Sequence, residues 1–148
     1  GLKDAHSTEF NPKTKNPVVF LIDEFINSAG EKQIRTQKSP LGGTMRLGAY
    51  ECVIKPKSLL SEIYEGKKSI NERHRHRFEA NPRYKKDYEK NGLIISGESS
   101  GLIEVVELAK HPFFIGVQFH PEFTSPLVRA NPVILAFIKK ASEYERAE

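Results

Sequence analysis

The sequence predicts an α/β fold in which a mixed sheet is flanked by helices, and three observations lead to this class. First, 18–22 is a continuous, β-branched apolar run, typical of a strand buried on both faces. Second, apolar segments at 93–96, 102–108 and 113–119 read as three strands joined by short turns, which favours a mixed sheet. Third, Asn131-Pro132 is typical of a helix start, so the strands are combined with helices.

The first half of the chain contains fewer regular elements. Residues 1–16 are predicted to be irregular, and the polar segment 27–43 to be a long loop of the kind that often forms a functional lid. Residues 44–54 alternate in polarity, which indicates an exposed or antiparallel strand. Ser58 is expected to cap a short helix that runs through Tyr64.

Two longer helices are expected in the second half. One begins at Asn81-Pro82 and ends at Gly92, and the other is the final helix. The apolar residues of the final helix recur at helical spacing, so we expect them to form one buried face. These residues are Ile134, Phe137, Ile138 and Ala141.

Composition limits the classes of protein that fit. The chain has 148 residues, of which 38% are hydrophobic and 28% charged, as in ordinary globular domains. The net charge of +4 is spread along the chain, which argues against a nucleic-acid-binding module. A single cysteine excludes an intrachain disulfide and favours the cytoplasm. No apolar run approaches the ~20 residues that a membrane helix needs.

The segment 117–122 carries the sharpest chemical pattern. An apolar strand ends at His120, Pro121 fixes the turn, and Glu122 follows two residues after the histidine. An imidazole titrates near neutrality, so His120 is a candidate general base, and Glu122 could hold its tautomer. On spacing alone, a surface turn with an incidental histidine explains the same residues.

The basic segment 73–77 allows several interpretations. If it is extended, Arg73, Arg75 and Arg77 share one face, and His74 and His76 share the other. The arginine face is either solvated or an anion-binding patch. An RNA-binding role ranks lowest, because interleaved aromatic residues are absent from the segment. No third ligand at suitable spacing joins the histidines, so a metal site is not expected.

Four segments together resemble class I glutamine amidotransferases, namely 1–10, 41–49, 72–79 and 116–123. They occur in the order found in that family and extend the resemblance over nearly the whole chain. They are most similar to the branch whose complete enzymes aminate UTP to CTP. The resemblance implies the class I amidotransferase, flavodoxin-like fold.

The resemblance also implies roles for individual residues. His120 and Glu122 match the catalytic base and its orienting acid. Glu9 and Arg77 match positions that hold the ammonium and carboxylate of glutamine, which suits an anion and a planar cationic fork. The loop matches a lid that takes part in activation by GTP. The lid residues concerned are Arg35, Gly42, Gly43 and Thr44.

The family's nucleophile is a cysteine on a glycine-flanked elbow between a strand and a helix. Cys52 is the chain's one cysteine, but it lies within a strand pattern and lacks such glycines, so we expect a packed structural thiol. By resemblance the chain starts after the elbow, so 1–148 is expected to be a single, N-terminally truncated domain. Alone, it is expected to be poorly stable and inactive towards glutamine.

The complete enzyme implied by the resemblance hydrolyses L-glutamine and uses the ammonia to convert UTP to CTP in pyrimidine nucleotide biosynthesis. Its ligands would be ATP with Mg²⁺, UTP and the effector GTP. No cofactor is expected in this chain itself. The missing part of the domain, a synthetase domain and further subunits of a homo-tetramer would be its partners. The alternative is a non-catalytic glutamine- or nucleotide-binding regulatory module of the same fold.

Overall fold

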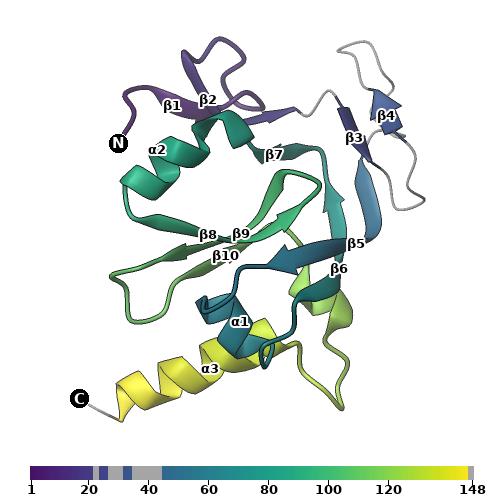
Figure 1. The fold of residues 1–148 in the computed structure, drawn as a ribbon, viewed down its shortest axis with the longest axis vertical. Helices are drawn as coiled ribbons and strands as arrows, with labels where there is room; N and C mark the ends of the chain where they lie inside the picture. Colours follow the sequence, from purple (N-terminus) through teal and green to yellow (C-terminus); the bar gives the residue numbers. More distant parts are fainter. Residues whose placement is uncertain (22–23, 27–31, 35–44, 147–148) are drawn as a thin grey trace.

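A computed structural model describes residues 1–21, 24–26, 32–34 and 45–146 (Figure 1). The strands are β1 (Ala5–Ser7), β2 (Asn16–Leu21), β3 (Glu24–Ile26), β4 (Lys32–Ile34), β5 (Arg46–Ile54), β6 (Ser69–His76), β7 (Phe78–Ala80), β8 (Leu93–Ser99), β9 (Leu102–Leu108) and β10 (Ile115–Val117). The α-helices are α1 (Leu59–Ile63), α2 (Lys85–Lys90) and α3 (Pro132–Glu145), and the 3₁₀ turns are η2 (Pro82–Tyr84) and η3 (Pro121–Thr124).

The larger sheet has the strand order β10-β9-β8-β5-β6 and is antiparallel throughout. Its longest pairing joins β5 to β6, with Arg46 opposite His76 at one end and Val53 opposite Ser69 at the other. Ser100 and Gly101 both have positive φ between β8 and β9. Two such residues make a tight hairpin turn whose twist matches that of the strands. The antiparallel strand predicted at 44–54 and the three late strands are confirmed.

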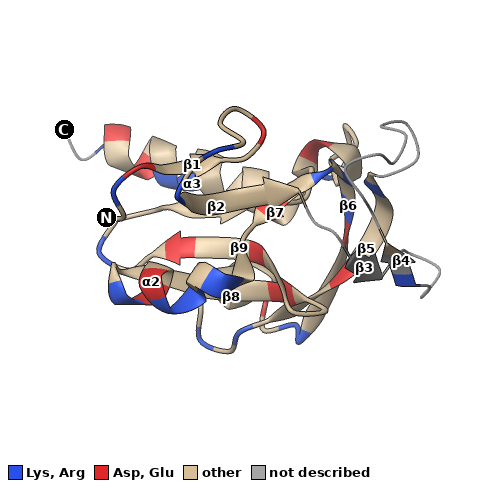
Figure 2. Cartoon of the chain, turned by 90° about the horizontal axis from the view of Figure 1, so that it is seen from above, with Lys and Arg blue, Asp and Glu red and all other residues tan. Residues whose placement is uncertain are grey.

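The smaller sheet contains the mixed pairing, with the order β1-β2-β7. β1 is parallel to β2, and β2 is antiparallel to β7. In the view from above, β2 and β7 form one layer and β8 and β9 form a second layer beside it (Figure 2). The prediction of an irregular 1–16 is wrong at β1, because this strand gains a partner only through the distant β2. The prediction of a strand buried on both faces is also wrong, since every residue of β2 is half-buried.

Local signals for helix starts are confirmed. The Ser58 side chain accepts a hydrogen bond from the Ser61 amide, and α1 follows directly. Asn81 caps η2, which leads into α2, and Gly92 follows with φ of +93°. Asn131 caps α3 by accepting from the Val133 amide. These caps satisfy amides that have no partner within the helix.

The predicted buried face of α3 is wrong. Phe137 and Ile138 are 55% and 56% exposed, Ala141 is exposed and Ile134 is only half-buried. Among the described residues of α3, Val133 in the first turn is the buried one. Within the part of the chain that the structure describes, α1 has five residues and packs only against the first part of the fourteen-residue α3, and Phe137 has the ring of Phe113 as a further neighbour (Figure 1).

The core lies between α1 and the larger sheet. Cys52, Leu60 and Val105 are fully buried there, which confirms that Cys52 is a packed thiol. Gly97 of β8 approaches this cluster so closely that a Cβ atom would lie 2.6 Å from the Cys52 sulfur. A glycine is therefore needed where β8 crosses this thiol.

The segment predicted as a continuous loop contains strand β4, which pairs with β3 in a small antiparallel hairpin. The prediction is therefore wrong at 32–34. The expected lid residues Arg35, Gly42, Gly43 and Thr44 lie outside the described residues. Among the helices that the structure describes, none is long and apolar enough to cross a membrane.

Candidate functional site

The turn that carries His120 follows the edge strand β10. The strand ends at Val117, two residues earlier than predicted, and Phe119 is buried beneath the turn. His120 has extended backbone angles and immediately precedes η3, which begins at Pro121. Because proline fixes φ and needs no amide partner, it suits this first helical position.

His120 and Glu122 form a hydrogen-bonded pair. The Nδ1 atom of His120 lies 2.7 Å from Oε1 of Glu122. An ionised carboxylate only accepts, so Nδ1 carries the proton and Nε2 keeps its lone pair in the neutral ring. The hydrogen bond from His120 holds the pKa of the Glu122 carboxyl below its usual value. The Phe123 ring stacks on the imidazole at 5.0 Å.

This geometry leaves the histidine available for proton transfer. The His120 side chain is 38% exposed, so the ring is oriented without being enclosed. Its backbone amide donates to the Arg73 carbonyl at 2.8 Å, which fixes the turn against β6. The pair can therefore act as a base with a fixed tautomer.

Glu9 and Arg77 lie at corresponding ends of the smaller sheet. Glu9 is exposed and directly follows Thr8, whose hydroxyl accepts from the Leu21 amide at 3.3 Å. Leu21 pairs with Phe78, and Arg77 directly precedes Phe78. Since neighbouring strands are about 4.8 Å apart, the backbones of Glu9 and Arg77 are separated by roughly 10 Å. A carboxylate and a guanidinium whose backbones are this far apart could pair with the ammonium and the carboxylate of an amino acid bound between them.

Arg77 is also connected to the histidine turn through β6. The Arg73 carbonyl that holds His120 is four residues before Arg77, or roughly 13 Å along an extended strand. Arg73 and Arg75 are exposed on this strand and His74 is buried, as the alternation predicts. Arg77 lies in the half-buried bend after β6, so it does not continue the arginine face.

A buried cluster of charged side chains lies on the inward face of β5 and β6, and it was not predicted from the sequence. Arg46 is 1% exposed and contacts the carboxylates of both Glu79, at 3.1 Å, and Glu104, at 2.7 Å. His74 lies 3.4 Å from Glu104, and His76 lies 3.2 Å from Glu79. Because Glu79 belongs to β7 and Glu104 to β9, Arg46 joins the smaller sheet to the larger one.

Burial and charge oppose each other in this cluster. Burial lowers the pKa of Arg46, but Glu79 and Glu104 outweigh it and raise the pKa above its ordinary value. Burial raises the pKa of Glu104 to about 7, against the lowering effect of Arg46. Burial lowers the pKa of His74 to about 3, with Arg46 adding to the effect, so the ring is neutral at pH 7. The apolar alternation of β5 gave no signal for the inward position of Arg46, because Leu47 on the opposite face is 56% exposed while Arg46 is buried.

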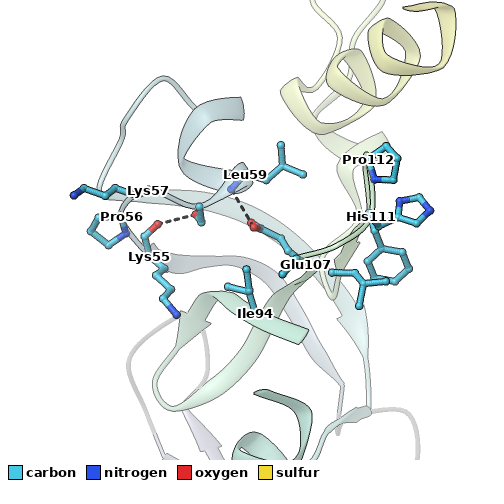
Figure 3. A pocket seen from close by; sticks show the side chains of 12 residues that line it. Lys55, Pro56, Lys57, Leu59, Ile94, Glu107, His111 and Pro112 are labelled. Carbon is cyan, nitrogen blue, oxygen red and sulfur yellow. Dashed lines mark hydrogen bonds between the residues drawn. The ribbon is translucent and has the colours of Figure 1, made fainter. Parts of the chain in front are cut away.

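A separate cavity of about 350 Å³ lies between the 55–59 loop and the β9–β10 turn (Figure 3). Its lining contains none of the four predicted catalytic or glutamine-binding residues. The carboxylate of Glu107 accepts hydrogen bonds from the amides of Leu59 and Leu60, at 3.0 and 2.8 Å. Glu107 therefore satisfies the start of α1 itself, and this helix end is not open to a bound anion.

Cys52 does not lie at the site. Its side chain is 0% exposed, and burial raises the pKa of its thiol to about 12, with Glu104 adding to the effect. A nucleophilic cysteine reacts as the thiolate, and these conditions suppress that form. Cys52 is thus excluded as the nucleophile.

Comparisons with known proteins identify the family of the chain. The sequence matches the glutamine amidotransferase class-I family over residues 24–140. It is 69% identical to a CTP synthase of Campylobacter jejuni over 97% of this chain and 26% of that protein. It is 59% identical to a CTP synthase of Helicobacter hepaticus over 99% of this chain and 27% of that protein. The chain spans about a quarter of the length of these relatives.

A solved structure shows the same fold. It is described as the Trypanosoma brucei CTPS glutaminase domain with bound acivicin, and it superposes with a TM-score of 0.81 at 34% identity. The similarity covers 95% of this chain and 51% of that one. The predicted resemblance and fold class are thereby confirmed, and the chain belongs to the class-I glutamine amidotransferase family.

Proposed function

We propose that this chain is the C-terminal part of the glutaminase domain of a CTP synthase. The observation that carries the proposal is the pair of His120 and Glu122, with Nδ1 and Oε1 2.7 Å apart on an exposed turn. Such a pair supplies the base and the orienting acid of a nucleophile–histidine–acid triad. The similarity to CTP synthases supports the assignment of this chemistry to glutamine hydrolysis.

In this proposal the nucleophile is a cysteine that lies outside 1–148, because Cys52 is excluded by its burial. His120 accepts the proton of the thiol, and the resulting thiolate attacks the side-chain amide of glutamine and forms a glutamyl thioester. His120 transfers a proton to the departing ammonia and then activates the water that hydrolyses the thioester. Glu122 keeps the reactive Nε2 of His120 unprotonated in the neutral ring and stabilises the charged ring.

Glu9 and Arg77 are proposed to bind the glutamine head group. The carboxylate of Glu9 would pair with the ammonium, and the guanidinium of Arg77 with the carboxylate. Their placement roughly 10 Å apart across three strands supports this role. The lid segment that includes Arg35 and Thr44 is proposed to take part in activation by GTP.

The remaining partners belong to the proposed complete enzyme. A synthetase domain would bind ATP with Mg²⁺ and UTP, and would use the released ammonia to form CTP. We place the enzyme in the cytoplasm as a homo-tetramer, as the resemblance implies. No cofactor is assigned to the residues of this chain.

The proposal is tested in the full-length protein by supplying either glutamine or free ammonia. We expect His120→Ala to lower glutamine-dependent CTP formation by at least about 10²-fold, the usual contribution of general acid–base catalysis. Glu122→Gln is expected to lower it as well, and both variants should retain ammonia-dependent activity. His111→Ala is the matched control, because this exposed histidine lies outside the turn. Equal loss with both nitrogen sources would contradict the proposal, and a wild type inactive with glutamine would favour a regulatory module.

A further inference from the structure

We propose that Glu72 is a positioning residue for the His120–Glu122 pair and that it acts through the hydroxyl of Thr124. The inference deepens the proposed glutaminase function and rests on it. The hydrogen bonds of Glu72 and Thr124 go to residues other than His120, so neither is assigned a catalytic role. Their proposed task is to fix the turn on which the catalytic pair stands.

Glu72 is a buried carboxylate whose hydrogen-bond donors are neutral. It is 4% exposed, on the inward face of β6. Its Oε1 atom accepts from the Tyr64 hydroxyl at 2.7 Å and from the Asn131 amide nitrogen at 3.0 Å. Its Oε2 atom accepts from the Thr124 hydroxyl at 2.7 Å. One side chain thus joins the end of α1, the η3 turn and the cap of α3 to the sheet.

Two adjacent residues of β6 hold the catalytic turn at both of its ends. The carbonyl of Arg73 accepts the backbone amide of His120 at 2.8 Å, and the preceding Glu72 binds Thr124. Only Pro121, Glu122 and Phe123 lie between these two attachment points in the chain. The turn therefore cannot shift along β6 without breaking one of the two bonds.

A second interaction strengthens the attachment at Thr124. Its hydroxyl also accepts from the Asn131 side chain at 2.8 Å, and Asn131 itself binds Glu72. The three side chains form a closed ring of hydrogen bonds in a partly buried region. Such a network is stronger than separate bonds, because each bond polarises the next.

The catalytic pair needs this external support, because its own side chains are poorly packed. The side chains of His120 and Glu122 are 38% and 57% exposed, so packing alone does not fix their direction. A displacement of about 1 Å at a catalytic group can cost about 10²-fold in rate. Burying the Glu72 carboxylate is unfavourable in itself. We therefore infer that its role is to hold the turn that carries His120 and Glu122 in a fixed position.

The test compares variants of Thr124 in the full-length protein. Thr124→Val keeps the shape but removes the hydroxyl, and Thr124→Ser keeps the hydroxyl. We expect Thr124→Val to lower kcat with glutamine by about 10- to 100-fold, the range expected for a displaced catalytic group. KM for glutamine and ammonia-dependent CTP formation should stay within about twofold, because binding and synthesis do not use the turn. Thr124→Ser should retain most of the wild-type kcat.

The matched control is Glu107→Gln. Glu107 is also 4% exposed and holds the start of α1 through the Leu59 and Leu60 amides, whereas Glu72 bonds to Tyr64 at the end of α1 and to Thr124 of η3. We expect Glu107→Gln to reduce stability and leave kcat unchanged, whereas Glu72→Gln should reduce both. If Glu107→Gln lowers kcat as much as Thr124→Val does, the effect is general destabilisation and the inference is wrong.

Crystal structures of the two Thr124 variants give a readout that does not depend on turnover. In Thr124→Val we expect the distance from Nδ1 to Oε1 to exceed hydrogen-bonding range, or the turn to occupy more than one position. In Thr124→Ser the distance of 2.7 Å should remain. An unchanged pair in Thr124→Val overturns the inference, whereas a wild type that releases no ammonia from glutamine overturns the proposed function.

Discussion

The perturbation Arg46→Met tests whether the buried ionic cluster holds the two sheets together. Methionine fills a similar space but removes the guanidinium that contacts both Glu79 and Glu104, which are 0% and 1% exposed. Breaking a buried ion pair by removing one partner costs about 3–5 kcal/mol, because the remaining charge stays buried. We expect a loss of this size at pH 8 in the free energy of unfolding of the complete glutaminase domain.

The loss should depend on pH with a definite sign. Burial raises the pKa of Glu104 to about 7 even with Arg46 present, and removing Arg46 raises it further. A carboxyl whose pKa is higher in the folded state than in the unfolded state contributes stability at low pH. That contribution is lost as the pH rises through the folded pKa. The difference between variant and wild type should therefore be smaller at pH 5.5 than at pH 8.

Urea unfolding at the two pH values measures both quantities. Lys140→Met is the control, because its pair with Glu143 is exposed and should contribute less than about 1 kcal/mol. The triple variant Arg46→Met/Glu79→Gln/Glu104→Gln should recover much of the loss, since no unpaired charge then remains. A loss below about 1 kcal/mol at pH 8, or an equal loss at both pH values, would refute this reasoning.

Three further predictions concern the core and the helix caps. Gly97→Ala should destabilise the domain by about 1–3 kcal/mol, because the new methyl would lie 2.6 Å from the Cys52 sulfur. Thermal unfolding should show that the double variant Gly97→Ala/Cys52→Ala recovers part of this stability, and no recovery would contradict the contact. Cys52 should resist iodoacetamide in the native domain and react after unfolding, because burial raises the pKa of its thiol to about 12. Peptide mass spectrometry measures the labelling, and rapid reaction of Cys52 in the native domain would disprove this. Asn131→Ala should cost at least about 1–2 kcal/mol through loss of the α3 cap, and unfolding in urea should show it. Asn131→Asp should lose no less, because its carboxylate could accept from the Val133 amide but could not donate to the buried Glu72, and a smaller loss would contradict the bond to Glu72.

Features governed by short-range chemistry could be predicted from the sequence. Ser58, Asn81 and Asn131 begin helical segments because each cap satisfies amides only two or three residues away. The pairing of His120 with Glu122 is equally local, since a proline turn separates them. The antiparallel pairing of β8 with β9 follows from a two-residue turn.

Features that depend on distant partners could not be predicted. Arg46 occupies an inward position of β5 that a sequence pattern assigns to an apolar residue, and its carboxylate partners come from β7 and β9. Glu72 is similar, because its donors lie on three separate elements. The apolar spacing of Phe137 and Ile138 predicts a buried face, but spacing does not reveal whether a neighbour is long enough to cover it.

The attachment of His120 to β6 has a consequence for solubility. β6 is the last strand of the larger sheet, and the Arg73 carbonyl on its outer edge is occupied by the His120 amide. An unoccupied edge strand offers its backbone to other chains and promotes aggregation. The proposed catalytic turn therefore also covers the β6 edge at Arg73, and substitutions that loosen it should yield protein that is both less active and more prone to form aggregates.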